Sequence, residues 1–431
     1  MAGILLKTNA MKFVKLYFML IAVLLSGYSS CSKEESAEQQ EEVEIEQPEN
    51  DNTPIEEPAE DESIHVTTGS ELLAAIAEAK AGDSIVVHGG TYALTSRIDV
   101  ESSGTELQMI ILMAAPDEER PVFDYSAMSE NASNQGMILD ADFWHIKGID
   151  FYNAGDNGMK IQGNNNLIEF CTFSECSDTG LQLDSGASNN TILNCDSFFN
   201  ADSSVENADG FACKLTAGSN NKFIGCRAWQ NLDDGWDGYL RGSDDIHTYY
   251  ENCWAINNGY LKDNSVSGGD GNGFKTGGSD DKTLKHNATY TNCLAVGNIA
   301  DGFDHNSNRG MVTIYNCSAN DNGKNYNFSN NNILTGLIIK NCVSLGNMGS
   351  TNATEKDTSS NSWMNGLTAK ETDFLSIETA QLLAARKADG SLPDIDFMHL
   401  TAGSNLIDKG VDVGLPFNGS APDRGAFEFE D

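Results

Sequence analysis

The chain has 431 residues and a formal net charge of -38, with 21% charged and 39% hydrophobic residues. The hydrophobic share is ordinary for a globular protein, and the length permits one large core or two domains. The strong negative charge excludes nucleic-acid binding that depends on phosphate contacts. Forty-one glycines against eight prolines, with many asparagines, predict frequent tight turns rather than disorder.

Residues 1–30 are predicted to form an export signal. Lys12 and Lys15 flank the start of an apolar run, Leu16–Leu25, which is shorter than the ~20 residues that a membrane span needs. Small residues then lead to Cys31, and this arrangement resembles the lipobox of bacterial lipoproteins, in which the cysteine carries the lipid. A plain secretory signal with an incidental cysteine is the alternative.

Residues 31–63 are predicted to be a disordered acidic tether. The segment is rich in Glu and Asp, its one basic residue is Lys33, and it has too few apolar side chains to fold. The Ser-Lys-Glu-Glu sequence after Cys31 resembles the surface-export signal of Bacteroidota lipoproteins. The resemblance implies an exported protein on the outer membrane, exposed at the cell surface and attached only through the lipid at Cys31. We expect a monomer.

A repeated pattern fills most of residues 64–348. Short phrases of β-branched and aromatic residues alternate with a second phrase, a glycine followed by an apolar residue, and both have the period of two that predicts strands. No long helical segment separates them, so we expect an all-β fold, a parallel β-solenoid with two or three strands per turn. Each first phrase contains a cysteine, and we expect these to form a buried column of free thiols rather than disulfides. The cysteines are Cys171, Cys195, Cys226, Cys253, Cys293, Cys317 and Cys342.

The two ends of the repeat are also informative. Residues 71–92 begin as an amphipathic helix and pass into a strand, and they resemble the capping helix and first turn of right-handed parallel β-helices. Residues 349–431 lose the repeat and resemble C-terminal extensions that fold back on bacterial β-helices. Within this extension, Glu378–Lys387 is predicted to form a short helix.

Aligning the glycine phrases predicts which side chains share a face. The residue two after each glycine points outward, and the residue between points into the core. The outward column is Lys160, Gln182, Ala212, Asp237, Lys275 and Asp304. Asp237 and Lys275 therefore fall on neighbouring turns, about 4.8 Å apart. The position before the glycine likewise makes neighbours of Asp209 and Asp234, with Asp233 adjacent in sequence.

Carboxylates this close repel one another unless some are protonated or a cation lies between them. Hard carboxylate oxygens favour Ca²⁺, and no His or Cys cluster offers a zinc site. The predicted Ca²⁺ ligands are Asp209, Asp233, Asp234 and Asp237. A set of solvated corner aspartates is the alternative. The register requires that Gly235 and Gly273 begin successive phrases, with an inserted loop at 257–271 beside the site.

Lys275 lies in the outward column beside these aspartates, and nearby glycines permit the close approach of a ligand. A lysine near a bound cation can lose its proton and act as a general base. An ordinary solvated lysine is the alternative.

Three motifs resemble polysaccharide lyase family 9, the calcium-dependent pectate lyases. They are D-G-F-A-C-K-L at 209–215, N-L-D-D-G-W-D at 231–237 and N-G-F-K-T-G-G at 272–278. The resemblance covers roughly 65–431 and implies that the four aspartates bind Ca²⁺ and that Lys275 is the Brønsted base. Such an enzyme removes the C5 proton of a uronate, and the C4 glycosidic oxygen then leaves. The expected partner is an anionic uronate polysaccharide, pectate.

An anionic polymer also needs local positive charge to offset the acidic surface. The basic candidates for substrate contact are Lys160, Lys214, Arg241, Lys262 and Arg309. Three rival functions remain: a galacturonan hydrolase, whose usual G-H-G and R-I-K phrases are absent; a lyase for rhamnogalacturonan, alginate or a glycosaminoglycan; and a non-catalytic surface glycan binder, which would not require Lys275.

Overall fold

The computed structural model describes residues 62–205 and 207–430. The predicted signal peptide, nearly all of the predicted tether and the predicted lipid site at Cys31 lie outside the described residues. In the part of the chain that is described, no helix is both long and apolar enough to cross a membrane.

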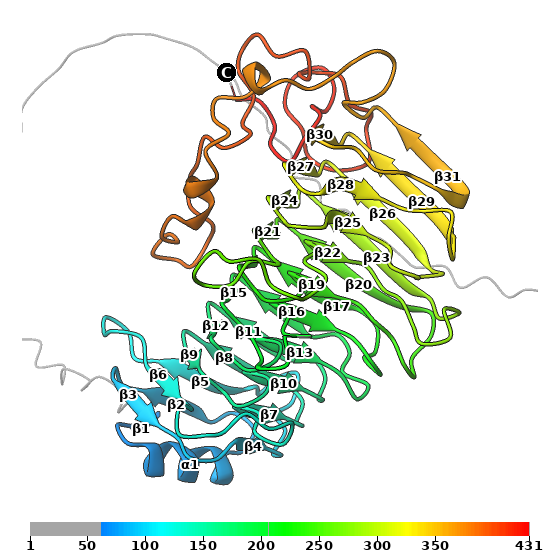
Figure 1. Cartoon of the computed structure of the whole chain (residues 1–431). Coiled ribbons are helices and arrows are strands. Elements are labelled where there is room, and N and C mark those ends of the chain that lie inside the picture. The colour runs from blue at the N-terminus through cyan, green and yellow to red at the C-terminus, as the bar shows by residue number, and fades with distance from the viewer. Residues whose placement is uncertain (1–61, 206, 431) are drawn as a thin grey trace, which may run out of the picture. The chain divides into compact units, whose positions relative to one another are not determined.

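Three parallel sheets, here called A, B and C, wind around a common core (Figure 1). Sheet A contains β1 (Ile64–Val66), β2 (Ser84–Val87), β5 (Ile110–Ala114), β8 (Trp144–Lys147), β11 (Leu167–Glu169), β14 (Thr191–Leu193), β17 (Asn221–Ile224), β20 (Ile246–Glu251), β23 (His286–Thr291), β26 (Met311–Tyr315), β29 (Leu334–Lys340) and β31 (Ala353–Ser359). Sheet B contains β3 (Thr91–Ala93), β6 (Val122–Asp124), β9 (Asp150–Tyr152), β12 (Thr172–Ser174), β15 (Asp196–Phe198), β18 (Arg227–Trp229), β21 (Trp254–Ile256), β24 (Leu294–Val296), β27 (Ser318–Asn320) and β30 (Val343–Leu345). Sheet C contains β4 (Ile98–Val100), β7 (Met137–Leu139), β10 (Met159–Ile161), β13 (Leu181–Leu183), β16 (Phe211–Cys213), β19 (Trp236–Asp237), β22 (Phe274–Lys275), β25 (Asp301–Asp304) and β28 (Lys324–Asn327).

Each full turn contributes one strand to each sheet, in the order A, B, C, and every strand pairs in parallel with its equivalent on the next turn. This confirms the predicted parallel β-helix. The sheet does extend beyond the predicted boundary at 348, because β31 pairs with β29.

The inward column of sheet C is a stack of large apolar side chains, as the alternation predicts. Phe211, Trp236, Phe274 and Phe303 are at most 1% exposed. Their rings stack at centroid separations of 5.1, 4.8 and 4.9 Å along the helix axis. Stacked rings of this kind add attraction beyond the burial of their area. Parallel strand pairing sets the turn spacing, and the ring stack of the inward column packs at this spacing where the predicted site lies.

The cysteines of the repeat form the predicted column of buried, free thiols. The asparagines that precede five of them have left-handed backbone angles, with φ between 49° and 59°. Asparagine tolerates this conformation better than other residues with a side chain, which explains its recurrence at this corner. These asparagines are Asn194, Asn252, Asn292, Asn316 and Asn341.

A second set of asparagines explains the repeated glycines. Their buried amides form a ladder in which each Nδ2 donates to the Oδ1 of the next turn at 2.8–3.0 Å. A methyl group added at the glycine before four of the inward residues of sheet C would lie 2.8 Å from a ladder nitrogen. The ladder residues are Asn200, Asn231, Asn258, Asn298 and Asn322, and the glycines are Gly210, Gly235, Gly273 and Gly302. These glycines serve close packing, not a left-handed turn.

Helix α1 (Gly69–Glu78) lies at the N-terminal end of the stack (Figure 1). It begins with a capping box, in which Thr68 Oγ1 accepts from the Glu71 amide and the Glu71 carboxylate accepts from the Thr68 amide. Its apolar face, with Leu72 and Ile76 buried, joins the main core.

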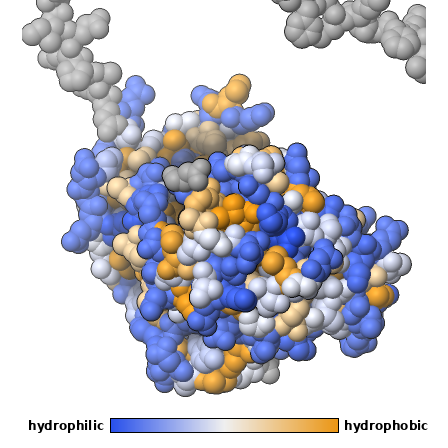
Figure 2. Space-filling model, turned by 90° about the horizontal axis from the view of Figure 1, so that it is seen from above, coloured by the Kyte–Doolittle hydropathy of each residue, from blue (hydrophilic) through white to orange (hydrophobic). Residues whose placement is uncertain are grey.

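The C-terminal extension packs on the outer face of sheet B, where Trp254 and Leu294 share an apolar cluster with Phe374 and Phe397. It contains two 3-10 helices, η1 (Glu371–Asp373) and η2 (Thr379–Leu383). The predicted helix over 378–387 is therefore shorter than expected. The carbonyls of Leu382 in η2 and of Ala384, the residue just after η2, accept hydrogen bonds from the Arg227 guanidinium of β18. Seen from above, the surface is largely hydrophilic, with apolar residues in small groups (Figure 2).

Candidate active site

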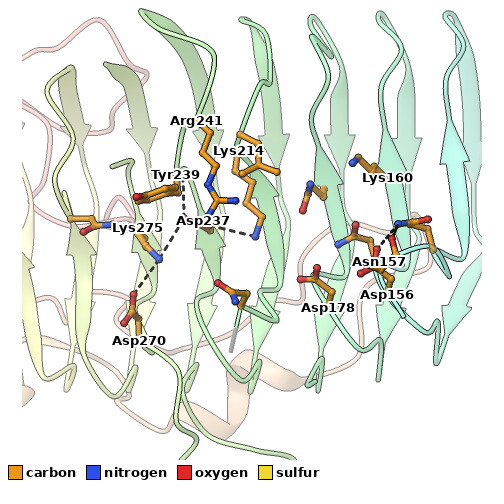
Figure 3. A pocket seen from close by; sticks show the side chains of 16 residues that line it. Asp156, Asn157, Lys160, Asp178, Lys214, Asp237, Tyr239, Arg241, Asp270 and Lys275 are labelled. Atoms are coloured by element: carbon orange, nitrogen blue, oxygen red, sulfur yellow. Dashed lines mark hydrogen bonds and ion pairs between the residues drawn. The ribbon is translucent and has the colours of Figure 1, made fainter. Parts of the chain in front are cut away.

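A pocket of about 490 Å³ lies on the outer face of sheet C. Figure 3 shows Asp156, Asp178 and Lys160 at one end, and Asp270 and Lys275 at the other. The floor follows the predicted outward column. Its lining residues include Lys160, Gln182, Lys214, Asp237, Tyr239, Arg241, Asp270 and Lys275.

The register of sheet C has the order that the repeat predicts. Gln182 pairs with Ala212, Ala212 with Asp237, and Asp237 with Lys275. The insertion at 257–271 is thus contained within one turn. Asp237 and Lys275 lie side by side on the pocket floor.

Three of the four predicted metal ligands come together. Asp209, Asp233 and Asp234 each offer a carboxylate oxygen, and these oxygens lie within 4.8 Å of one another, all on buried residues. Asp237 lies outside this group. Its Oδ2 is 3.5 Å from Lys214 Nζ, and its Oδ1 is 3.7 Å from Lys275 Nζ. Asp237 therefore lies between two lysines, and its charge still acts on the cluster, since it raises the pKa values of Asp209 and Asp234.

Backbone and side-chain donors fix the cluster at the corner before sheet C. Asp234 Oδ1 accepts from the amide and the side chain of Asn272, at 2.8 and 2.9 Å. Asp209 Oδ1 accepts from the Asp234 amide at 3.2 Å, and its Oδ2 accepts from Thr179 Oγ1 at 3.1 Å. Asp233 Oδ1 accepts from the amide of Asp270. These bonds hold the carboxylates in place although their charges repel.

Two buried lysines flank the cluster. Lys214 Nζ donates to Asp209 Oδ2 at 2.8 Å. Lys275 Nζ lies 3.0 Å from Asp234 Oδ2 and 3.2 Å from Asp270 Oδ2. The dashed lines of Figure 3 join both lysines to Asp237 and join Lys275 to Asp270.

Burial and crowding strongly shift the pKa values of these groups. Burial raises the pKa of Asp209 to about 8 and the pKa of Asp234 well above its usual range. Burial also lowers the pKa of the Lys275 amine, but the charges of Asp234 and Asp237 outweigh it and hold this pKa well above its usual value. Two lysines therefore do not fully offset the negative charge of the cluster.

The residues fit a hard divalent cation. Asp234 Oδ2 is buried and accepts no hydrogen bond; the Lys275 amine 3.0 Å away is its ion-pair partner, and the oxygen keeps a lone pair available for an ion. The cluster offers oxygen ligands alone, and hard cations prefer these. A bound dication would also keep ionised the carboxylates whose pKa values burial raises.

The predicted substrate contacts separate into two groups. Lys160 and Arg241 line the pocket with Lys214, and the Arg241 side chain is 61% exposed. Lys262 and Arg309 do not line it, so the structure does not support contact with a substrate bound there. Lys262 belongs to the insertion, which reaches back over earlier turns, and its Nζ lies 2.7 Å from Glu175 Oε1.

Sequence reasoning missed Asp270 and Tyr239, which both line the pocket. Tyr239 lies two residues after Asp237, so the period-two alternation was a usable signal for it. Asp270 lies in the insertion, where the repeat supplies no register. Only its flanking glycines, Gly269 and Gly271, marked the position.

Comparisons with a family model and with known proteins agree with one another. Residues 55–355 match the family described as Pel9A-like, right handed beta helix region. The chain is 37% identical to pectate lyase L of Dickeya chrysanthemi over 372 residues, covering 83% of this chain and 85% of the relative. It is 38% identical to pectate lyase L of Paenibacillus polymyxa (strain SC2) over 369 residues, 80% of each chain.

Two solved structures share the fold. The crystal structure of pectate lyase Pel9A superposes with a TM-score of 0.75 at 35% identity, covering 83% of this chain and 90% of that one. A rhamnogalacturonan lyase superposes with a TM-score of 0.70 at 27% identity, covering 79% and 97%. The three sheets, the register of sheet C and the family match together show that the chain belongs to the Pel9A-like right-handed β-helix family.

Proposed function

We propose that the protein is a calcium-dependent polysaccharide lyase that cleaves pectate by β-elimination. One observation carries the proposal: the amine of Lys275 lies on a pocket floor beside three clustered, buried aspartates. Relatives that are named pectate lyases match this chain over most of its length, which supports the same substrate class here.

β-Elimination begins with removal of the weakly acidic C5 proton of a uronate. Lys275 is suited to accept this proton because its Nζ faces the pocket and two carboxylates hold it there. Asp209, Asp233 and Asp234, with Asp237 next to them, would hold Ca²⁺, which would supply positive charge for the uronate carboxylate and would offset the aspartates that favour a protonated Lys275.

The basic side chains of the pocket have different roles. Lys214 is committed to Asp209 and is only 8% exposed, so we assign it to the cluster and not to the substrate. Lys160 is paired with Asp184, at 3.2 Å. Arg241 is the most available cation, because its partner Asp280 is itself 68% exposed and can yield to a substrate carboxylate. We therefore assign Arg241 to binding of the anionic polymer.

Rhamnogalacturonan is the second candidate substrate, since a structure named rhamnogalacturonan lyase superposes over 97% of its length. The test is incubation with polygalacturonate and, separately, with rhamnogalacturonan, while ultraviolet absorbance reports unsaturated sugars. We expect absorbance to rise with polygalacturonate. A rise with rhamnogalacturonan alone would assign the second substrate. No rise with any uronate polymer, from a folded protein, would reject lyase activity.

A further inference from the structure

The amine of Lys275 depends on neighbouring groups for its position. It ends a flexible four-carbon stem, whose ordering costs conformational entropy. Three carboxylates surround it: Asp234 at 3.0 Å, Asp270 at 3.2 Å and Asp237 at 3.7 Å. Asp234 belongs to the metal-binding cluster, and Asp237 is shared with Lys214. Asp270 is the remaining partner, and its carboxylate pairs with no other residue in the contacts described.

The backbone around Asp270 is firmly attached to the cluster. The Asp270 amide donates to Asp233 Oδ1. On one side, Gly269 donates to Ser267 Oγ at 3.3 Å. On the other side, the Gly271 carbonyl accepts from the Ala300 amide at 2.9 Å. The loop therefore presents the Asp270 side chain to Lys275 from a fixed point.

The glycines beside Asp270 are what allow this close approach. A methyl group at Gly269 would lie 2.6 Å from the Leu232 carbonyl and 2.8 Å from Asp233 Oδ1. Gly271 has φ +75, and a methyl group there would lie 2.0 Å from the Ile299 side chain. Both positions therefore require glycine. The Gly-Asp-Gly sequence at 269–271 therefore lets the backbone pass close enough to place Asp270 over the aspartate cluster.

We propose that Asp270 is a positioning residue for the proposed base: its Oδ2 accepts a hydrogen bond from Lys275 Nζ and holds the amine toward the substrate. Figure 3 shows the amine between Asp237 on the sheet and Asp270 on the loop. The Asp270 side chain is 67% exposed, so its removal leaves the core intact, unlike removal of buried Asp234. The proposal rests on the proposed lyase function.

Two substitutions separate geometry from charge. Asp270→Ala removes the acceptor, and Asp270→Asn keeps a neutral acceptor in the same place. Asp263→Ala is the matched control, because Asp263 is an exposed aspartate of the same loop whose described bonds go only to Ser265. Calcium affinity is measured by calorimetry on each full-length variant, and kcat and KM are measured on polygalacturonate.

We expect Asp270→Ala to lower kcat by about 10- to 100-fold, with KM and the Ca²⁺ affinity within about twofold of wild type. Asp270→Asn should recover most of the loss, and Asp263→Ala should match wild type. Four results would overturn the proposal: wild-type kcat in Asp270→Ala, a tenfold loss of Ca²⁺ affinity, a rise in KM that accounts for the whole loss, or equal losses in both Asp270 variants.

A second readout does not need turnover. Acetic anhydride acylates free amines, and mass spectrometry of peptides quantifies the modification of Lys275. We expect faster acylation of Lys275 in Asp270→Ala than in wild type or Asp263→Ala, because the amine is released. Equal rates would contradict the positioning role. If wild type cleaves no uronate polymer, the proposed function fails, and this labelling still decides the role of Asp270.

Discussion

Gly235 offers a sharp test of the asparagine ladder, because its substitution acts on packing alone. It precedes Trp236 and Asp237 on the strand that carries the site. In Gly235→Ala the new methyl group would lie 2.6 Å from the Gly273 carbonyl and 2.8 Å from Asn258 Nδ2. The carbonyl belongs to the backbone and cannot rotate away. The strand or the ladder must therefore shift.

The expected cost follows from these two contacts. Overpacking of a filled core costs about 1–3 kcal/mol. Displacing the Asn258 amide breaks its 2.9 Å bond to Asn298, and a buried group left without a partner costs about 1–3 kcal/mol more. We expect Gly235→Ala to lower the free energy of unfolding by about 4 kcal/mol.

The assay is guanidinium unfolding followed by circular dichroism, with Gly403→Ala as the control. Gly403 is an exposed glycine of the C-terminal extension with nothing within 4 Å of an added methyl group. Its substitution should be neutral or stabilise by less than about 1 kcal/mol. Equal stability of the two variants would refute the claim that the ladder requires glycine.

Two further predictions concern stability near the site. Thr276 is 1% exposed and its Oγ1 has no hydrogen-bond partner. Thr276→Val should therefore raise the free energy of unfolding by about 1 kcal/mol, measured by thermal or chemical denaturation. A lower free energy of unfolding in the variant would indicate that a bound water satisfies the hydroxyl. Burial lowers the pKa of His286 from 6.5 to about 4, so its neutral form contributes stability that is complete above pH 6.5 and is lost as pH falls toward 4. The stability lost on protonation of His286 is about 3 kcal/mol in total. His286→Gln should therefore lose less stability than wild type between pH 7 and pH 4. If the two proteins lost the same stability over this range, the lowered pKa of His286 would be contradicted.

The fold was predictable because the sequence pattern that specifies it repeats on every turn and involves residues close together in the chain. Alternation placed Trp236 and Phe274 in the core and Asp237 beside Lys275 on the outer face, and the structure has this register. The left-handed corners explain one set of asparagines. The asparagine ladder was not predicted. In the sequence, an asparagine whose side-chain amide bonds to the next turn looks the same as an asparagine at a left-handed corner.

The site was predictable only as far as the register extends. Asp209 and Asp234 meet because their corners stack. Lys214 was expected to contact substrate, but its long side chain turns back to Asp209. Lys262 was expected near the substrate as well, but the insertion carries it to Glu175, three turns earlier in sheet B. Long side chains and inserted loops escape the repeat, so their partners have to be observed.

The most direct test of the central claim is the initial rate of unsaturated-product formation from polygalacturonate by wild type and Lys275→Ala, each with Ca²⁺ and with a chelator. The proposed mechanism predicts a rate for wild type with Ca²⁺ that falls by about 100-fold or more in Lys275→Ala, since a positioned general base contributes about 10²–10⁴-fold. Chelation should abolish the wild-type rate. Full activity of Lys275→Ala, or an undiminished rate in chelator, would contradict the assignment of this lysine and of the aspartate cluster.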